Sequence, residues 1–199
     1  NLMIRTTQTG DLMAVLIVNE ERKEDIKLLL GTVRNRFPEI TSLLYVVNPK
    51  LNDTIYDLPV KVFHGNPYIT ERLGDKLFHI GPKSFFQTNT KQARVLYNQV
   101  IRFGAFQGNE MVYDLYSGLG TIGIYLADRV KKVIGIEEIE EAVKWAAENI
   151  ELNGVTNCRY YCGDVRATLT EEFIAANGHP DVLIVDPPRA GLHPDVVDF

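Results

Sequence analysis

The chain has 199 residues, a formal net charge of −5, 45% hydrophobic residues and 24% charged residues. This composition is ordinary for a globular protein with one large domain or two small ones. Its apolar runs are far shorter than the roughly 20 residues of a membrane span, and no signal-peptide pattern opens it. We therefore expect a cytoplasmic monomer with no membrane partner. The acidic balance argues against a large basic nucleic-acid surface, although a local patch is still compatible with RNA binding.

The two cysteines do not form a recognisable functional motif. Cys158 and Cys162 lie four positions apart in a predicted strand, a spacing that matches neither a zinc site nor a good disulfide. We expect reduced, buried thiols and no metal site. The chain starts at Asn1 without an initiator Met and stops at Phe199, so we expect a piece of a longer protein.

The first part of the chain alternates apolar runs with turn residues. Apolar positions at helical spacing predict one helix over 20–37, which Pro38 ends. The remaining runs predict a small α+β domain over 1–82 with mostly antiparallel strands. These predicted strands cover 11–18, 41–48, 59–65, 68–73 and 77–80.

The second part of the chain shows strict alternation of strands and helices. Thr90 is the predicted cap of a helix that runs to Phe103. After that helix, strands are predicted at 111–115, 132–136, 158–162 and 181–185, and helices at 121–129, 139–152 and 165–176. This alternation predicts an α/β fold with a parallel, Rossmann-like sheet over 83–199, incomplete at its C-terminal end. Ligands of such sheets bind at the carboxyl ends of the strands.

A glycine turn follows the first strand of this predicted sheet. Gly118, Gly120 and Gly123 have the spacing G-x-G-x-x-G. Glycine is favoured there because the turn needs unusual backbone angles and because a ligand must approach the backbone closely. The pattern alone indicates a nucleotide-like cofactor without saying which one.

Acidic residues at the ends of the strands favour S-adenosylmethionine (SAM) over NAD. Glu137 lies about 20 residues after Gly118, where either cofactor needs an acid for its ribose. Asp114 beside the turn suits the cationic sulfonium and amino groups of SAM and suits a pyrophosphate badly. Asp164 can accept from an adenine amino group, and Asp186 ends the last strand. Four carboxylates are thus expected on one rim of the sheet.

Three motifs resemble the RNA uracil-5-methyltransferase family, whose members act on 23S ribosomal RNA or on transfer RNA. They are DLYSGLGTIG, IVDPPRAGL and GPKSFFQTN, and the likeness extends over nearly the whole chain. The resemblance implies SAM-dependent methylation of C5 of a uridine in RNA, with S-adenosylhomocysteine (SAH) as product. Ribosomal RNA is favoured over transfer RNA as the partner.

The resemblance also assigns cofactor contacts. Gln87 matches a glutamine that contacts SAM near the reaction centre, and Tyr116 matches an aromatic residue that lies against the cofactor. Glu137 matches the acid of the ribose. Thr121 stands where many members carry Asn. With Asp114, Gly118, Gly120, Asp164 and Asp186, these residues make up the predicted cofactor site.

The substrate contacts implied by the resemblance involve two further positions. Asp186 matches an aspartate that binds the uracil and borders the methionine part of SAM, and Phe85 falls where a ring packs on the flipped base. A carboxylate can accept from uracil N3–H, and an aromatic ring offsets the stacking lost on flipping. Asp186 and Gln87 are the candidate catalytic residues, whereas Phe86 is expected in a core.

The family forms a covalent intermediate between a cysteine and C6 of the uracil, which makes C5 nucleophilic. The cysteine lies in an S-C-N-P motif on the strand after DPPR, and a glutamate base follows it. Neither motif is present in residues 1–199, so we expect the nucleophile beyond Phe199 and no turnover by these residues alone.

Two alternatives stay open. One is another SAM-dependent methyltransferase, acting on guanine N2 or on a small molecule, which needs no covalent cysteine. The other is a non-catalytic RNA-binding role for residues 1–80, with a few cations as contacts. Those cations are Lys61, Arg72, Lys76 and Lys83.

Overall fold

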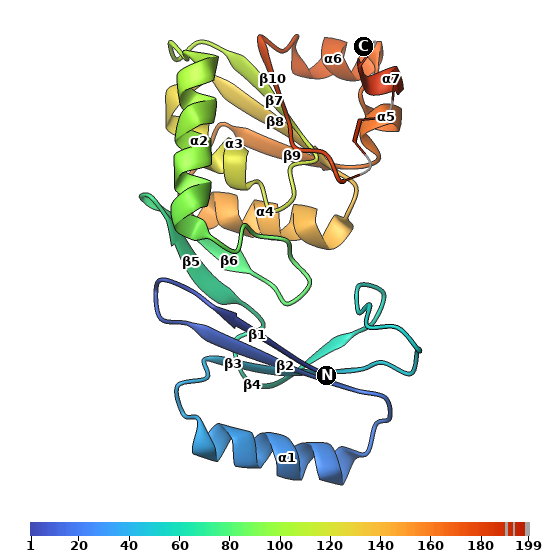
Figure 1. The fold of residues 1–199 in the computed structure, drawn as a ribbon. Coiled ribbons are helices and arrows are strands. Elements are labelled where there is room, and N and C mark those ends of the chain that lie inside the picture. Colours follow the sequence, from blue (N-terminus) through green and yellow to red (C-terminus); the bar gives the residue numbers. More distant parts are fainter. Residues whose placement is uncertain (190, 193, 198–199) are drawn as a thin grey trace. The chain divides into compact units, whose positions relative to one another are not determined.

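The computed structural model describes residues 1–189, 191–192 and 194–197. The chain divides into two compact units (Figure 1). The first comprises Asn1–Arg72 and His79–Ser84, and the second comprises Leu73–Phe78 and Phe85–Phe199. The boundary between predicted domains at 82/83 stays a prediction.

The first unit contains a four-stranded mixed sheet in the order β1-β2-β3-β4. The strands are β1 (Leu2–Thr6), β2 (Leu12–Val18), β3 (Ser42–Val47) and β4 (Val60–Gly65). β2 and β3 pair in parallel, whereas β1 and β4 pair antiparallel to their neighbours. Helix α1 (Lys23–Arg36) connects β2 to β3, as a parallel pair requires. The sequence analysis did not predict β1.

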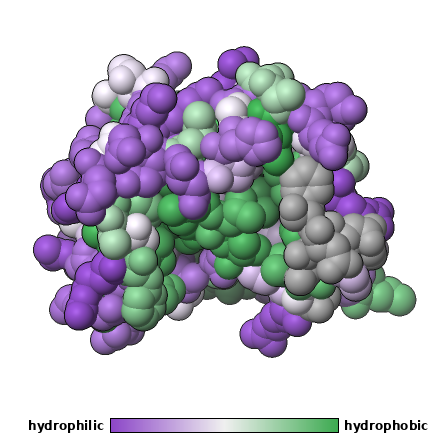
Figure 2. Space-filling view, turned by 90° about the horizontal axis from the view of Figure 1, so that it is seen from above, coloured by the Kyte–Doolittle hydropathy of each residue, from purple (hydrophilic) through white to green (hydrophobic). Residues whose placement is uncertain are grey.

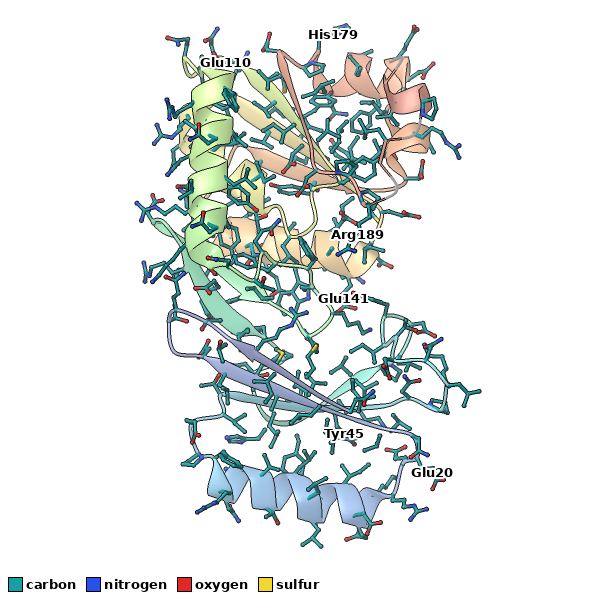
Figure 3. All side chains as sticks on the ribbon, viewed as in Figure 1. Glu20, Tyr45, Glu110, Glu141, His179 and Arg189 are labelled. Carbon is teal, nitrogen blue, oxygen red and sulfur yellow. The ribbon has the colours of Figure 1, made fainter. Side chains whose placement is uncertain are left out.

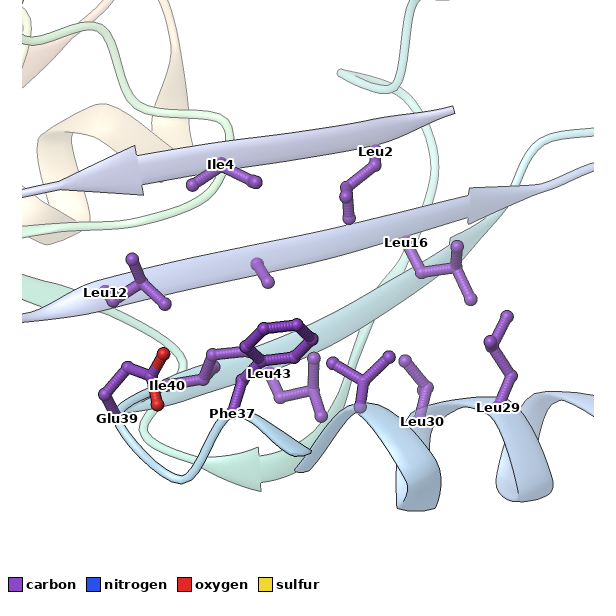
Figure 4. A pocket seen from close by; sticks show the side chains of 12 residues that line it. Leu2, Ile4, Leu12, Leu16, Leu29, Leu30, Phe37, Glu39, Ile40 and Leu43 are labelled. Carbon is purple, nitrogen blue, oxygen red and sulfur yellow. The ribbon is translucent and has the colours of Figure 1, made fainter. Parts of the chain in front are cut away.

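One face of this sheet is only partly covered. Helix α1 packs Ile26 and Leu30 against Ala14 and Leu43. Beside it lies an apolar groove of about 430 Å³, in which Leu2 and Ile4 of β1 are 61% and 59% exposed. Figure 4 shows the apolar side chains of β1, β2 and α1 that line this groove, with Glu39 at one end.

The chain then forms a hairpin from β5 (Ile69–Leu73) and β6 (Lys76–Ile80). Gly74 makes the turn with a φ of +66°, an angle that glycine adopts without steric cost. This confirms the predicted hairpin and its turn residues.

The second unit contains a parallel sheet in the order β10-β7-β8-β9. Its strands are β7 (Met111–Leu115), β8 (Lys132–Glu137), β9 (Cys158–Cys162) and β10 (Val182–Val185). Its helical elements are α2 (Thr90–Gly104), α3 (Thr121–Leu126), the 3-10 turn η1 (Ala127–Arg129), α4 (Glu140–Leu152), α5 (Val165–Thr168), α6 (Glu171–Asn177) and α7 (Pro194–Val197). The predicted Rossmann-like α/β architecture is confirmed.

Helices cover both faces of the parallel sheet. Figure 1 shows α2, α3 and α4 on one side and α5 and α6 on the other. Tyr113, Leu115, Ile134 and Ile136 form a core with residues of α5 and α6. Because side chains alternate along a strand, Asp114 and Gly135 point to the opposite face, toward α3.

Two details of the helices differ from the prediction. Asn89, not Thr90, caps α2, with its Oδ1 accepting from the amide of Gln92 at 3.1 Å. The predicted helix 165–176 is two helices, because Thr170 starts a new one by accepting from Phe173 N at 3.2 Å.

Among the described residues, no helix is long and apolar enough to cross a membrane, and no group of three His, Cys, Asp or Glu side chains could hold a metal.

Candidate functional site

The predicted acids gather at the carboxyl edge of the parallel sheet. Pairing places Val185 beside Leu115, Leu115 beside Ile136, and Glu137 beside Cys162, so the four strands end at one edge. In Figure 3, Glu110 and His179 lie at one end of this unit, and they precede β7 and β10. Glu141 and Arg189, which follow β8 and β10, lie away from that end.

The opposite, amino edge of the sheet faces the viewer in Figure 2. Hydrophilic side chains cover most of that face, with an apolar area near its centre. The acids that the sequence analysis selected do not lie at this edge. The carboxyl edge is therefore the candidate site.

The glycine turn joins β7 to α3 with three residues in the left-handed region. Tyr116, Gly118 and Gly120 have φ values of +62°, +55° and +73°. The turn is held to the sheet because Ser117 N donates to Ile136 O at 3.1 Å, and Gly120 N donates to Ser117 O at 2.9 Å. A non-glycine residue at positive φ is strained, so Tyr116 marks a conformation that the surrounding structure imposes.

The glycines of the turn serve two different purposes. A Cβ built on Gly118 would meet no atom within 4 Å, so the backbone there is open to a ligand. A Cβ on Gly120 or Gly123 would lie 2.6 or 2.4 Å from atoms of the Tyr160 side chain. Gly118 therefore fits the expected close approach of a cofactor, whereas Gly120 and Gly123 make room for a ring beneath the turn.

Asp114 lies under the turn and not at the surface. Its side chain is buried, and Oδ2 accepts from Gly123 N at 3.1 Å, while Oδ1 has no hydrogen-bond partner among the described residues. Burial, with a smaller contribution from the negative charges of Asp186 and Glu137, raises the pKa of Asp114 from 3.8 to about 7. A direct contact of Asp114 with SAM stays a prediction, and the contact that the structure shows is with the backbone of α3.

Glu137 ends β8 and reaches the turn from the side. Its Oε2 accepts from Gly118 N at 2.8 Å, and its Oε1 accepts from Ile139 N at 2.9 Å. These bonds fix the carboxylate beside the open backbone of Gly118. Each carboxylate oxygen has two lone pairs, so Glu137 can still accept from the hydroxyls of a ribose. The predicted ribose acid is thus held in a geometry suited to that role.

The other predicted cofactor residues lie around the same edge. Asp164 caps α5, with Oδ1 accepting from Ala167 N at 2.9 Å. Asp186 is exposed directly after β10, and its amide donates to Leu115 O at 3.4 Å. Thr121 opens α3, with its Oγ1 3.0 Å from the hydroxyl of Tyr97. The charges of Asp186 and Glu137 both act on the Asp114 carboxyl.

The aromatic and amide residues of the SFFQ motif precede α2. Phe85 is 72% exposed, and Gln87 is half-buried. Phe86 packs near Phe78, with ring centroids 6.0 Å apart. The ring of Phe85 is thus open to a partner, while the ring of Phe86 is half-buried near that of Phe78. The place of Phe86 in a core stays a prediction. Tyr116 is half-buried against the α5–α6 core.

The residues at this edge fit a cationic, nucleoside-like cofactor. The backbone at Gly118 is open, and the carboxylates of Glu137 and Asp186 lie at the same edge. Two buried oxygen atoms, Asp114 Oδ1 and Ser117 Oγ, have no hydrogen-bond partner among the described residues. Such atoms carry a desolvation cost unless a water or ligand satisfies them. The carboxylates of Glu137 and Asp186 suit a cationic sulfonium better than an anionic pyrophosphate.

Cys158 does not have the character of an enzymatic nucleophile. Both cysteines are free thiols, and burial raises the pKa of Cys158 to about 12. A thiol with so high a pKa is not ionised at neutral pH, and the thiolate is the reactive form. Cys162 is exposed, contrary to the expected burial, and its thiol donates to Glu138 O at 3.6 Å.

Two of the four cations predicted for RNA contact are engaged by acids. Lys76 is only 8% exposed, and its Nζ lies 2.6 Å from Asp128. Lys61 Nζ lies 2.5 Å from Glu21. The expectation that Lys76 lies on a free basic face is therefore wrong, because the ammonium is buried with a carboxylate partner. The RNA-binding alternative for residues 1–80 therefore loses Lys76 as a contact, while Arg72 is exposed.

Three residues of the site were missed by the sequence analysis. Tyr97 bonds to Thr121, Ser117 places its unpartnered hydroxyl in the turn, and Tyr160 fills the space below it. Burial raises the pKa of Tyr97 to about 12. A glycine inside a strand, such as Gly135, often marks the close approach of another group, and it was the available signal for Tyr160.

Comparison with known proteins agrees with this site. The family described as tRNA (Uracil-5-)-methyltransferase matches residues 60–199. The chain belongs to this family. The match includes the SFFQ motif, the glycine turn and the DPPR motif, and it confirms the resemblance to RNA uracil-5-methyltransferases.

Curated relatives and a solved structure extend the likeness to the whole chain. An uncharacterized RNA methyltransferase of Bacteroides thetaiotaomicron is 48% identical over 100% of this chain and 44% of its own length. Another, of Porphyromonas gingivalis, is 49% identical over 99% of this chain and 42% of its own length. The chain thus spans less than half the length of these relatives.

The solved structure is that of Pyrococcus abyssi tRNA (uracil-54, C5)-methyltransferase in complex with S-adenosyl-L-homocysteine. It is 32% identical, has a TM-score of 0.78, and is matched over 99% of this chain and 45% of its own. The likeness therefore covers both units of the chain.

Proposed function

We propose that residues 83–199 bind SAM at the carboxyl edge of the parallel sheet, as part of an enzyme that methylates C5 of a uridine in RNA. The observation that carries the proposal is the fixed pair of Gly118 and Glu137, joined by a hydrogen bond of 2.8 Å beside backbone with no atom in the way. The family supports SAM as the cofactor, and the Pyrococcus abyssi structure contains its product SAH.

Each residue at the edge has a defined part in this proposal. Glu137 would hold the ribose hydroxyls, and Gly118 would let the cofactor approach the backbone. Asp186, exposed after β10, would accept from uracil N3–H and border the methionine part of the cofactor. Phe85, with its open ring, would stack on the flipped uracil. Gln87 would orient the reacting end of the cofactor. When bound, SAM supplies the methyl group.

The nucleophile of the proposed reaction is a cysteine outside residues 1–199. Uracil C5 becomes nucleophilic when a thiolate adds to C6, and the pKa of about 12 makes Cys158 unsuitable. Cys162 lies on β9, whereas the family's cysteine motif lies on the strand that follows DPPR, and DPPR itself comes after β10. A glutamate base outside this chain would remove the C5 proton.

The substrate class is proposed more finely as 23S ribosomal RNA. The family name and the Pyrococcus abyssi structure name transfer RNA instead, so the experiment must offer both. The proposal requires methylation at uridine C5, because Asp186 and Phe85 would contact the uracil base itself. It does not depend on the fold of the RNA that contains this uridine.

The test uses the full-length protein with isotopically labelled SAM and two substrates, unmodified 23S ribosomal RNA and unmodified transfer RNA. Nucleosides from the digested RNA are separated and identified by mass spectrometry. We expect label in 5-methyluridine, in the ribosomal RNA arm, and loss of that label in Asp186→Asn. Label in a methylated guanosine, or SAM consumption without RNA, would contradict the proposal. Label only in transfer RNA would correct the substrate class alone.

A further inference from the structure

The side chain of Tyr160 lies beneath the glycine turn. The residue lies on β9 directly beside Gly135 of β8 in the parallel register. A Cβ on Gly135 would lie 2.0 Å from the Tyr160 ring. The ring therefore crosses β8 in space that only a glycine leaves free.

The same ring continues under the turn and the start of α3. A Cβ on Gly120 would lie 2.6 Å from Tyr160 Cζ, and a Cβ on Gly123 would lie 2.4 Å from its hydroxyl oxygen. Three glycines from two segments thus shape one slot for a single side chain. The glycines at 120, 123 and 135 and the tyrosine at 160 form a set in which each position constrains the others.

The Tyr160 hydroxyl ends at the turn itself. It donates to Gly120 O at 3.0 Å. Gly120 O also accepts from Ile124 N at 2.9 Å, the first hydrogen bond of α3. Gly120 N in turn donates to Ser117 O at 2.9 Å. The hydroxyl therefore fixes one peptide group that determines the path of the chain from Ser117 through Gly118 to α3.

We propose that Tyr160 is a positioning residue of the cofactor site, which holds the glycine turn in its binding geometry through the bond from its hydroxyl to Gly120 O. The inference rests on the proposed binding of SAM at Gly118 and Glu137. Gly118 N must stay within reach of Glu137 for both to meet the cofactor, and Gly120 is two residues away. Packing alone would leave the ring able to fill the slot without fixing this peptide group.

The neighbouring tyrosine provides a matched control. Tyr161 is on the same strand, and its hydroxyl donates to Asn177 Oδ1 at 2.6 Å, on the face of the sheet that carries α6. Tyr160→Phe and Tyr161→Phe each delete one bonded hydroxyl and keep the ring. They differ in whether the lost bond ends at the turn.

The experiment measures SAH affinity by calorimetry in the full-length protein and its two variants, together with the melting temperature without ligand. We expect Tyr160→Phe to weaken SAH binding by about 3- to 10-fold, the loss typical of one hydrogen bond, and Tyr161→Phe to change it less than about twofold. In steady state, Tyr160→Phe should raise KM for SAM and leave kcat at saturating SAM unchanged, a split that a general loss of stability does not produce.

Each contrary result has a separate meaning. Equal SAH affinity in the two variants would overturn the role of Tyr160, and so would a Tyr160→Phe protein that fails to fold, because the hydroxyl would then serve the stability of the sheet. Absence of SAH binding in the unmodified protein would instead contradict the proposed function.

Discussion

Asp114 lies one residue before the end of β7 and Glu137 ends the neighbouring β8, yet the two lie on different sides of the glycine turn. Asp114 is buried below it and accepts from Gly123 N, whereas Glu137 is half-buried beside it and accepts from Gly118 N. Both carboxylates therefore hold the turn by its backbone. Only Glu137 does so at a position where the backbone is also open to a ligand.

The two sides of the turn therefore have different roles: the lower side supports the turn, and the upper side is open to bind a ligand. The lower side of the turn contains Asp114 and Tyr160, and there glycines make room for the protein's own side chains. The upper side contains Gly118 and Glu137, and there glycine leaves room for something else. Substitutions that disturb the packing or the buried carboxyl below the turn should thus change stability or its pH dependence, while substitutions above it should change cofactor affinity directly. Tyr160→Phe is the exception below the turn, because it removes the bond that holds Gly120 O.

The largest expected effect is a loss of stability when the space below the turn is filled. Gly135→Ala places a Cβ 2.0 Å from the Tyr160 ring and should lower the free energy of unfolding by roughly 1–3 kcal/mol, the usual cost of overpacking. Gly31→Ala in α1, where a Cβ meets no atom within 4 Å, is the control and should stabilise slightly. Urea denaturation of the full-length variants measures both. Equal midpoints would show that the slot below the turn is not tightly filled.

The second largest expected effect is a loss of SAH affinity when Glu137, above the turn, is replaced. Glu137→Gln replaces a charged acceptor that bonds two backbone amides, and it should weaken SAH binding by roughly 10-fold or more. Its neighbour Glu138 is exposed, so Glu138→Gln should leave the affinity unchanged. Calorimetric titration of both variants distinguishes them. Similar affinities would mean that Glu137 does not meet the cofactor.

A pH titration separates the two carboxylates further. Burial raises the pKa of Asp114 from 3.8 to about 7. Between these two pH values the Asp114 carboxyl is therefore protonated in the folded chain and ionised in the unfolded chain. Stability from this group is complete below about pH 4 and is lost as the pH rises to about 7, by at most about 1.4 kcal/mol per pH unit. Asp114→Asn does not titrate.

The measurement is urea unfolding of the unmodified protein and of Asp114→Asn between pH 4 and 8. The stability of the unmodified protein should fall relative to the variant through that window and then stay level. Parallel pH profiles would place the Asp114 carboxylate in a more solvated environment than its burial indicates.

The smallest expected effect is at the start of α3. Tyr97→Phe removes the 3.0 Å bond to Thr121 Oγ1, which should cost about 0.5–1.5 kcal/mol of stability. Tyr125→Phe removes a bond to the Asn98 side chain at the surface and should cost less. Thermal melts of the two variants compare them. A larger loss for Tyr125→Phe would exclude Tyr97 as a support of the turn.

Much of this arrangement was predictable from local patterns. The apolar run at 132–136 gave strand β8, because strands buried on both faces have continuous apolar sequences. The glycine spacing and the acid at position 137 located the turn and its partner. Strand β1 was missed because it is an edge strand in which Leu2 and Ile4 are exposed. Burial therefore imposes no recognisable apolar pattern on this segment of the sequence.

The division between the two sides of the turn was not predictable. Asp114 and Glu137 look alike in sequence, and only the alternation of side chains along β7 places Asp114 below the turn. Tyr160 is distant in sequence from the glycines that it contacts, and no local pattern joins them. Such long-range complementarity depends on the register between β8 and β9, which sequence spacing does not specify.

The most direct test of the central claim, that the upper side of the turn binds SAM, is a calorimetric titration of the full-length protein with SAH and, in parallel, with NAD. We predict saturable binding of one SAH per chain and no heat with NAD, because the acids at the carboxyl edge disfavour a pyrophosphate. No binding of SAH by a folded sample, or binding of NAD in its place, would contradict the account.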